Sequence, residues 1–95
     1  MCSKTGEMNV SDDHPYAVVA EIDCKSILVR ENTPSSPTTD FDVYDPDTNS
    51  LPFRAAQGES YIFESSPSTY YRAGTTVGYI QAVSGTVTFG KVHQQ

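Results

Sequence analysis

Alternating carboxylates in the middle of the chain have the residue types and spacing to bind a hard cation. Asp45, Asp47 and Asn49 alternate as the oxygen ligands do in the first half of an EF-hand calcium loop. The second half of that loop is missing, because Ser50 replaces its glycine and Ala56 its bidentate glutamate. A solvated turn built by aspartate and proline explains the same residues without metal. We therefore expect no cofactor, and the candidate ligands, if calcium binds, are Asp45, Asp47 and Asn49.

The residues that could act as acid–base catalysts are poorly placed. His14 and His93 are the two histidines, and both lie in polar segments near the ends of the sequence. We expect these segments to fray, whereas a general base must be held within hydrogen-bond reach of its nucleophile. Glu59 and Glu64 could be the paired carboxylates of a glycosidase, but a small sandwich offers little cleft for a sugar. The sequence has no Gly-x-Ser-x-Gly elbow and no P-loop, so we predict that the protein is not an enzyme.

Tyrosines are the side chains best suited to contact a partner or a sugar. Tyrosine supplies a broad contact area at low entropic cost. Tyr70 and Tyr71 are adjacent, so one of them must face outward if this stretch is extended. Tyr79 is expected to cover the bare backbone of Gly90 across a strand pair. The sequence thus makes Tyr70 and Tyr71 the better contact candidates.

The composition restricts the classes of function. The chain has 95 residues, of which 37% are hydrophobic, so we expect one small domain with a modest core. Its formal net charge of −6 repels phosphate and disfavours nucleic acid and anionic membranes. No apolar run approaches the roughly 20 residues of a membrane span. The first residues lack the apolar segment of a secretory signal, so we expect synthesis in a cytoplasm without export.

Hydrophobic patterning predicts the elements that hold these residues. Residues 1–14 are polar and aperiodic, and we predict a flexible N-terminal arm followed by a single domain over residues 15–95. No segment shows the apolar period of a helix. Short alternating stretches separated by glycine and proline turns instead predict an all-β fold. We expect a small antiparallel β-sandwich or barrel of six or seven short strands.

The last third of the chain predicts a C-terminal β-hairpin closed at Ser84-Gly85, because a two-residue turn would fix the register of its strands. One face of this hairpin is apolar and should be core. The other is half apolar, so we expect the arm or a neighbouring chain to cover it. The core face holds Ile80, Ala82, Val87 and Phe89. The other face holds Val77, Tyr79 and Val92.

Two segments of the second half resemble small all-β virion proteins of tailed bacteriophages. They are residues 53–63 (FRAAQGESYIF) and 71–80 (YRAGTTVGYI), and the likeness is to head-decoration (cement) and accessory proteins with A-G-E-S-Y-x-F and A-G-x-x-V-G-Y turns. Gln57 departs from the usual small residue. The resemblance implies a non-enzymatic virion subunit, made in the host cytoplasm, that binds capsid proteins and forms a homo-oligomer.

Three functions therefore compete. The first is a capsid decoration or cement protein that stabilises the shell through protein–protein contacts. The second is a carbohydrate-binding β-sandwich that uses Tyr70 or Tyr71, and the third is a small hydrolase that uses the aspartate cluster. We expect the first, with no role for nucleic acid or membrane. Its predicted partner contacts are Tyr70, Tyr71, Val77, Tyr79 and Val92.

Overall fold

The computed structural model describes residues 3–32, 38–46 and 52–95, and these residues form strands and connections without a helix. The all-β prediction is confirmed, and the described residues contain eight strands in place of the expected six or seven. Accordingly, this part of the chain contains no helix with the length and apolarity of a membrane span. The strands are β1 (Lys4–Val10), β2 (Tyr16–Val19), β3 (Ser26–Glu31), β4 (Phe41–Tyr44), β5 (Phe53–Ala55), β6 (Ser60–Glu64), β7 (Thr76–Ala82) and β8 (Val87–Gln94).

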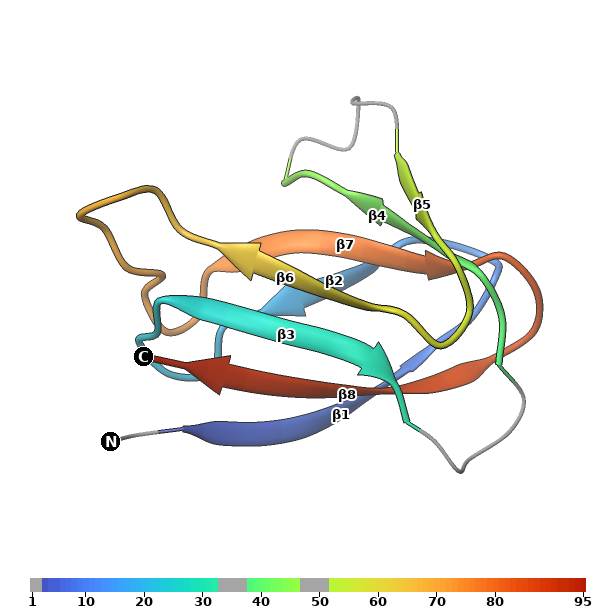
Figure 1. Cartoon of the computed structure of the whole chain (residues 1–95), viewed down its shortest axis with the longest axis horizontal. Coiled ribbons are helices and arrows are strands. Elements are labelled where there is room, and N and C mark those ends of the chain that lie inside the picture. Colours follow the sequence, from blue (N-terminus) through green and yellow to red (C-terminus); the bar gives the residue numbers. More distant parts are fainter. Residues whose placement is uncertain (1–2, 33–37, 47–51) are drawn as a thin grey trace.

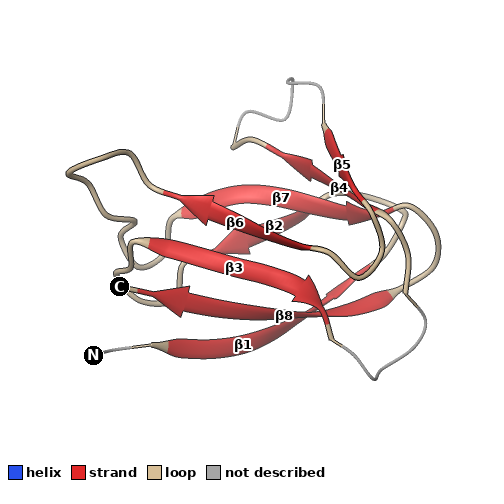
Figure 2. Cartoon of the chain, viewed as in Figure 1, coloured by secondary structure: helices blue, strands red, loops and turns tan. Residues whose placement is uncertain are grey.

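The strands form two packed four-stranded sheets, so the fold is a sandwich (Figures 1 and 2). Sheet A has the order β1-β8-β3-β6 and sheet B the order β2-β7-β4-β5, and every pairing is antiparallel. Consecutive strands thus alternate between the sheets except at β4 and β5. This is the strand order of a jelly roll, the eight-stranded double Greek key.

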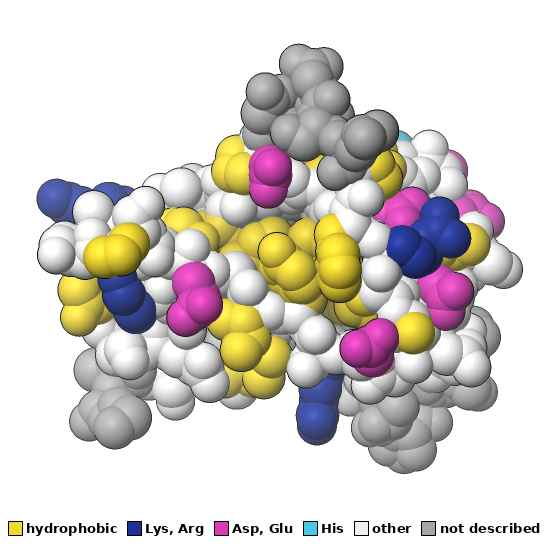
Figure 3. Space-filling model, turned by 45° about the horizontal axis from the view of Figure 1, so that its top comes forward, with side chains coloured by type: hydrophobic (Ala, Val, Ile, Leu, Met, Phe, Trp, Pro, Cys, Tyr) yellow, Lys and Arg dark blue, Asp and Glu magenta, His cyan; other side chains and the backbone are white. Residues whose placement is uncertain are grey.

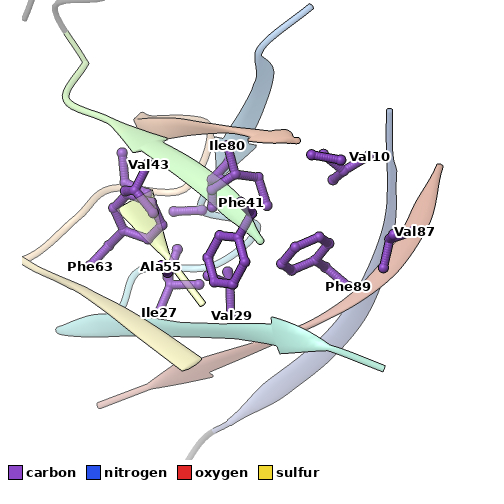
Figure 4. Close-up of a cluster of buried hydrophobic side chains, with 14 of the residues drawn as sticks. Val10, Ile27, Val29, Phe41, Val43, Ala55, Phe63, Ile80, Val87 and Phe89 are labelled. Atoms are coloured by element: carbon purple, nitrogen blue, oxygen red, sulfur yellow. The ribbon is translucent and has the colours of Figure 1, made fainter. Parts of the chain in front are cut away.

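The core lies between the inner faces of the two sheets (Figure 4). Phe41 of sheet B and Phe89 of sheet A meet edge to face, with ring centroids 4.9 Å apart. Ile27 and Val29 of β3 and Ile80 of β7 are fully buried around them. The alternation of side chains along each strand therefore supplies one apolar layer from each sheet.

The predicted C-terminal hairpin is wrong, because β7 and β8 belong to different sheets. β7 pairs with β2 and β4, whereas β8 pairs with β1 and β3. Residues 83–86 cross from one sheet to the other, and Gly85 adopts a positive φ of 75° there. The predicted core face is nevertheless buried, because the inner sides of β7 and β8 face each other across the sandwich. Its residues are Ile80, Ala82, Val87 and Phe89.

The predicted flexible arm is also wrong over most of its length. Lys4–Val10 forms β1 and pairs in register with β8, with Met8 opposite Phe89. Val10 is fully buried, and Met8 packs against the core. The segment lacks a run of β-branched residues, so its strand conformation depends on hydrogen bonds to β8 more than on local propensity.

Candidate functional site

A cleft of about 420 Å³ opens on the side of the sandwich where β6 forms the edge of sheet A. β4 ends at Tyr44, which pairs with Tyr79, so residues 76–78 of β7 have no β4 partner within the described part of the chain. The cleft occupies this gap. It is lined by β6, the connection that follows it, the start of β7, and Asp45 with Pro46.

The connection after β6 is held to the body of the protein by the residues that precede β3. Lys25 Nζ donates hydrogen bonds to the carbonyl oxygens of Ser66 and Thr69, both at 2.8 Å. Cys24 and Tyr71 exchange two backbone hydrogen bonds of 3.0 and 2.8 Å. The wall of the cleft is therefore fixed to the residues before β3 at Ser66, Thr69 and Tyr71.

Three tyrosines line the cleft in different environments. Tyr70 is 58% exposed, and Lys25 Nζ lies 5.6 Å from the centre of its ring. Tyr71 is half-buried, and burial raises the pKa of its phenol above the ordinary value. Tyr61 is also half-buried and meets Phe63 edge to face at 4.9 Å. Of the adjacent pair Tyr70 and Tyr71, Tyr70 is thus the outward-facing residue.

The remaining predicted contact residues do not share one surface. Val77 is 4% exposed and belongs to the core, so its expected place on an outer face is wrong. Tyr79 is half-buried in sheet B opposite Ala17 and Tyr44. Val92 is partly exposed in sheet A. The expected pairing of Tyr79 with Gly90 does not occur, because these residues lie in different sheets.

The predicted calcium ligands are only partly described. Asp45 is exposed and lines the cleft. Asp47 and Asn49 lie outside the described residues, so the calcium prediction stays a prediction. In the parts that are described, no three histidine, cysteine, aspartate or glutamate side chains gather as metal ligands.

One end of the sandwich holds a buried polar cluster that the sequence did not predict. His93 is fully buried, so the prediction that its segment frays is wrong. Its Nε2 accepts a hydrogen bond from the Glu21 N–H at 2.9 Å. Its Nδ1 lies 3.0 Å from the carbonyl oxygen of Lys4 and must be the protonated nitrogen, because that partner is an acceptor. Lys91 is buried beside it on β8. These buried residues link neighbouring strands. The other histidine, His14, is exposed and lies next to Asp13.

The cleft offers aromatic rings, hydroxyl groups and two carboxylates, Asp45 and Glu64, and such groups can bind a ligand. Its described lining contains no histidine, lysine or cysteine. Comparisons of the chain with protein families, with curated proteins and with solved structures found no match. The candidate function therefore depends on the fold, the surface and the sequence resemblance.

Proposed function

We propose that the protein is a non-enzymatic virion subunit that decorates a capsid and stabilises the shell through protein–protein contacts. The observation that carries the proposal is an exposed aromatic surface beside the cleft. Phe53 and Tyr70 are each 58% exposed, and Tyr61 lies between them: it lines the cleft with Tyr70, and its ring centroid is 5.8 Å from that of Phe53. We call Phe53, Tyr61 and Tyr70 the rim patch.

The rim patch has the composition of a protein-binding surface. Aromatic residues are enriched at the centres of protein interfaces, and large exposed apolar patches mark interaction sites. Figure 3 shows hydrophobic side chains gathered in the middle of one face of the molecule. Acidic residues border the cleft at Asp45 and Glu64. A neutral or basic surface on a neighbouring protein would complement such a patch.

The architecture and the sequence resemblance agree with this role. Jelly rolls form the shells of many viruses and also occur in lectins, so the fold supports the proposal by analogy only. The resemblance to phage decoration proteins includes residues 53–63, and this segment carries two of the three rim-patch residues. A small domain that meets a shell through such a patch gains stability from the contact by mass action.

The test mixes the purified protein with purified shells of the major coat protein from the same virus. Co-sedimentation measures binding, and scanning calorimetry measures the unfolding temperature of the small protein. Phe53→Ser and Tyr70→Ser should each weaken binding by roughly 10-fold or more, as expected for aromatic anchors of an interface. Val83→Ser is the matched control, because Val83 is an exposed hydrophobic residue outside the rim patch.

We expect the wild-type protein to sediment with the shells and to melt at a higher temperature in their presence. An unchanged melting curve together with no co-sedimentation would refute the decoration role. Equal binding by the Val83→Ser and Tyr70→Ser variants would show that the shell is bound elsewhere, which contradicts the rim patch as the contact surface.

Carbohydrate binding is the second candidate, and the lining of the cleft favours it. Tyrosine rings, the carboxylate of Glu64 and the hydroxyls of Ser65, Thr69 and Thr75 surround one cavity of saccharide size. A glycan array with the wild-type protein and the Tyr70→Ala variant tests this function. Binding of a saccharide that the variant loses would support it, whereas an empty array would exclude it for the glycans displayed.

A further inference from the structure

The four edge strands of the sandwich differ in how they are protected from pairing with another chain. β2 has four residues and a register shift at Val18/Val19, and β5 has three residues directly after Pro52. β1 carries the exposed charges of Lys4 and Glu7. Short length, bulges, proline and charge are the usual protections of an edge. β6 carries one exposed charge, Glu64, and beside it Ile62, which is 48% exposed.

The backbone of β6 has hydrogen-bonding groups that point away from its neighbour β3. The Ser65 N–H donates to the Lys25 carbonyl oxygen at 3.1 Å, which places residue 65 in a hydrogen-bonded pair with β3. Because such pairs alternate along an antiparallel ladder, residues 61 and 63 also face β3. The N–H and C=O groups of residues 60, 62 and 64 therefore face outward, and no described strand pairs with them.

An apolar row crosses the outer face of sheet A and ends at this edge. Val92 of β8 lies opposite Leu28 of β3, and Leu28 lies opposite Ile62 of β6. Directly opposed side chains on one face of a sheet pack against each other. The row thus ends at Ile62 on the edge strand β6, where half of the side chain is exposed. A strand added to this edge would cover that side chain.

We propose that two copies of the chain pair through β6, antiparallel and in a register centred on Ile62. In this register Ile62 faces Ile62 of the other copy, and Ser60 faces Glu64. No like charges oppose each other, and the outward backbone groups of residues 60, 62 and 64 all find partners.

The paired sheets A form one eight-stranded sheet, and the apolar row continues across it from Val92 to Val92. This contact is isologous and closes at two copies. Pairing of β6 with β1 would instead propagate into an open fibre, and the charges on β1 oppose it. The contact uses the strand edge and Ile62.

Sedimentation velocity of the purified protein tests the pairing. The wild-type chain should sediment as a dimer that dissociates on dilution. Ile62→Pro should be monomeric, because proline removes an N–H that the dimer needs and that β3 does not use. Ile62→Lys keeps the N–H and should raise the dissociation constant by roughly 10-fold or more through buried charge and lost apolar contact. Val83→Lys is the control and should dimerise like the wild type.

Hydrogen exchange locates the contact if a dimer forms. The amides of Ser60, Ile62 and Glu64 should exchange more slowly as protein concentration rises, while those of β1 should not change. A monomeric wild-type protein at millimolar concentration would overturn the proposal, and so would a folded Ile62→Lys variant that dimerises normally. These measurements need no shell, so a dimer that fails to bind shells refutes the decoration role and leaves the pairing intact.

Discussion

Lys91 Nζ lies 2.8 Å from Glu21 Oε2, and the two side chains differ strongly in exposure. The lysine side chain is 6% exposed and the glutamate side chain 40%. Lys91 also donates a hydrogen bond of 3.1 Å to the Val19 carbonyl oxygen. The pair links β8 of one sheet to the connection between β2 and β3, so it fastens the end of the sandwich.

Because the two side chains differ in exposure, we predict that substitutions of Glu21 and Lys91 lower the free energy of unfolding by different amounts. Glu21→Gln should lower the free energy of unfolding by about 1–3 kcal/mol, because it leaves the buried ammonium of Lys91 with neutral acceptors only. Lys91→Met should cost less, since the methionine fills the space of the lysine stem and the carboxylate of Glu21 keeps its water. Urea unfolding of both variants measures the difference, and a larger loss in Lys91→Met would contradict the prediction.

Gly78 is predicted to tolerate no side chain. A Cβ at this position would lie 2.5 Å from Phe63 Cε1 and 2.8 Å from the Tyr44 carbonyl oxygen, so a backbone strand would have to move. Gly78→Ala should destabilise the fold by about 1–3 kcal/mol or more through overpacking. Gly90→Ala is the matched control, because the nearest atom to its Cβ is the Arg30 carbonyl oxygen at 3.9 Å. Thermal unfolding should separate the two variants, and equal melting temperatures would disprove the close approach.

His93 is predicted to be a neutral imidazole protonated on Nδ1. The Glu21 N–H needs Nε2 as its acceptor, and the Lys4 carbonyl needs the Nδ1 proton. Long-range ¹H–¹⁵N NMR at neutral pH should show the nitrogen shifts of this tautomer, and the opposite tautomer would contradict the geometry. His93→Leu should lower the unfolding free energy by about 1–3 kcal/mol, because it leaves buried polar groups unpaired.

Two glutamates should give the stability of the protein opposite responses to pH. Burial raises the pKa of Glu31 above its ordinary value of 4.5, although the Thr39 N–H donates to its carboxylate. The hydrogen bond from Lys91 lowers the pKa of Glu21 below the same value. The stability that Glu31 contributes is therefore present below about pH 4.5 and is lost as pH rises through its folded pKa. The stability that Glu21 contributes is present above that pH and is lost as pH falls.

Urea unfolding between about pH 3.5 and 7 tests both signs. Relative to the wild type, Glu31→Gln should gain stability as pH rises. Glu21→Gln should approach the wild type as pH falls. A constant difference between the wild type and Glu31→Gln over this range would show that the carboxyl of Glu31 titrates normally in the folded protein.

The sequence predicted which faces are buried better than which strands are neighbours. Side chains alternate with a period of two in any strand, so Ile80 and Phe89 are inward whether their strands pair or face each other. The pair Ser84-Gly85 is compatible with a hairpin turn and also with a connection that crosses between the sheets. Only the packing of the whole domain distinguishes the two, because β8 gains two strand partners in sheet A.

The candidate site was predicted in part. Tyr70 and Tyr71 were named from their residue type and adjacency, and both line the cleft. Tyr61 was not among the predicted contacts, because only the folded chain brings it beside both Tyr70 and Phe53. His93 was missed as a buried residue because its partners, Lys4 and Glu21, lie more than 70 positions away along the chain.

The position of β8 between β1 and β3 also determines when the protein can fold during synthesis. Both flanking strands leave the ribosome long before Val87–Gln94, so neither has its central partner while the chain is growing. Sheet A can be completed only after translation of β8, and its completion joins residues that are far apart in the sequence. Such non-local pairing makes folding slow. Until then the apolar side chains of β3 lack the cover of the completed sandwich, and such exposed surface favours aggregation.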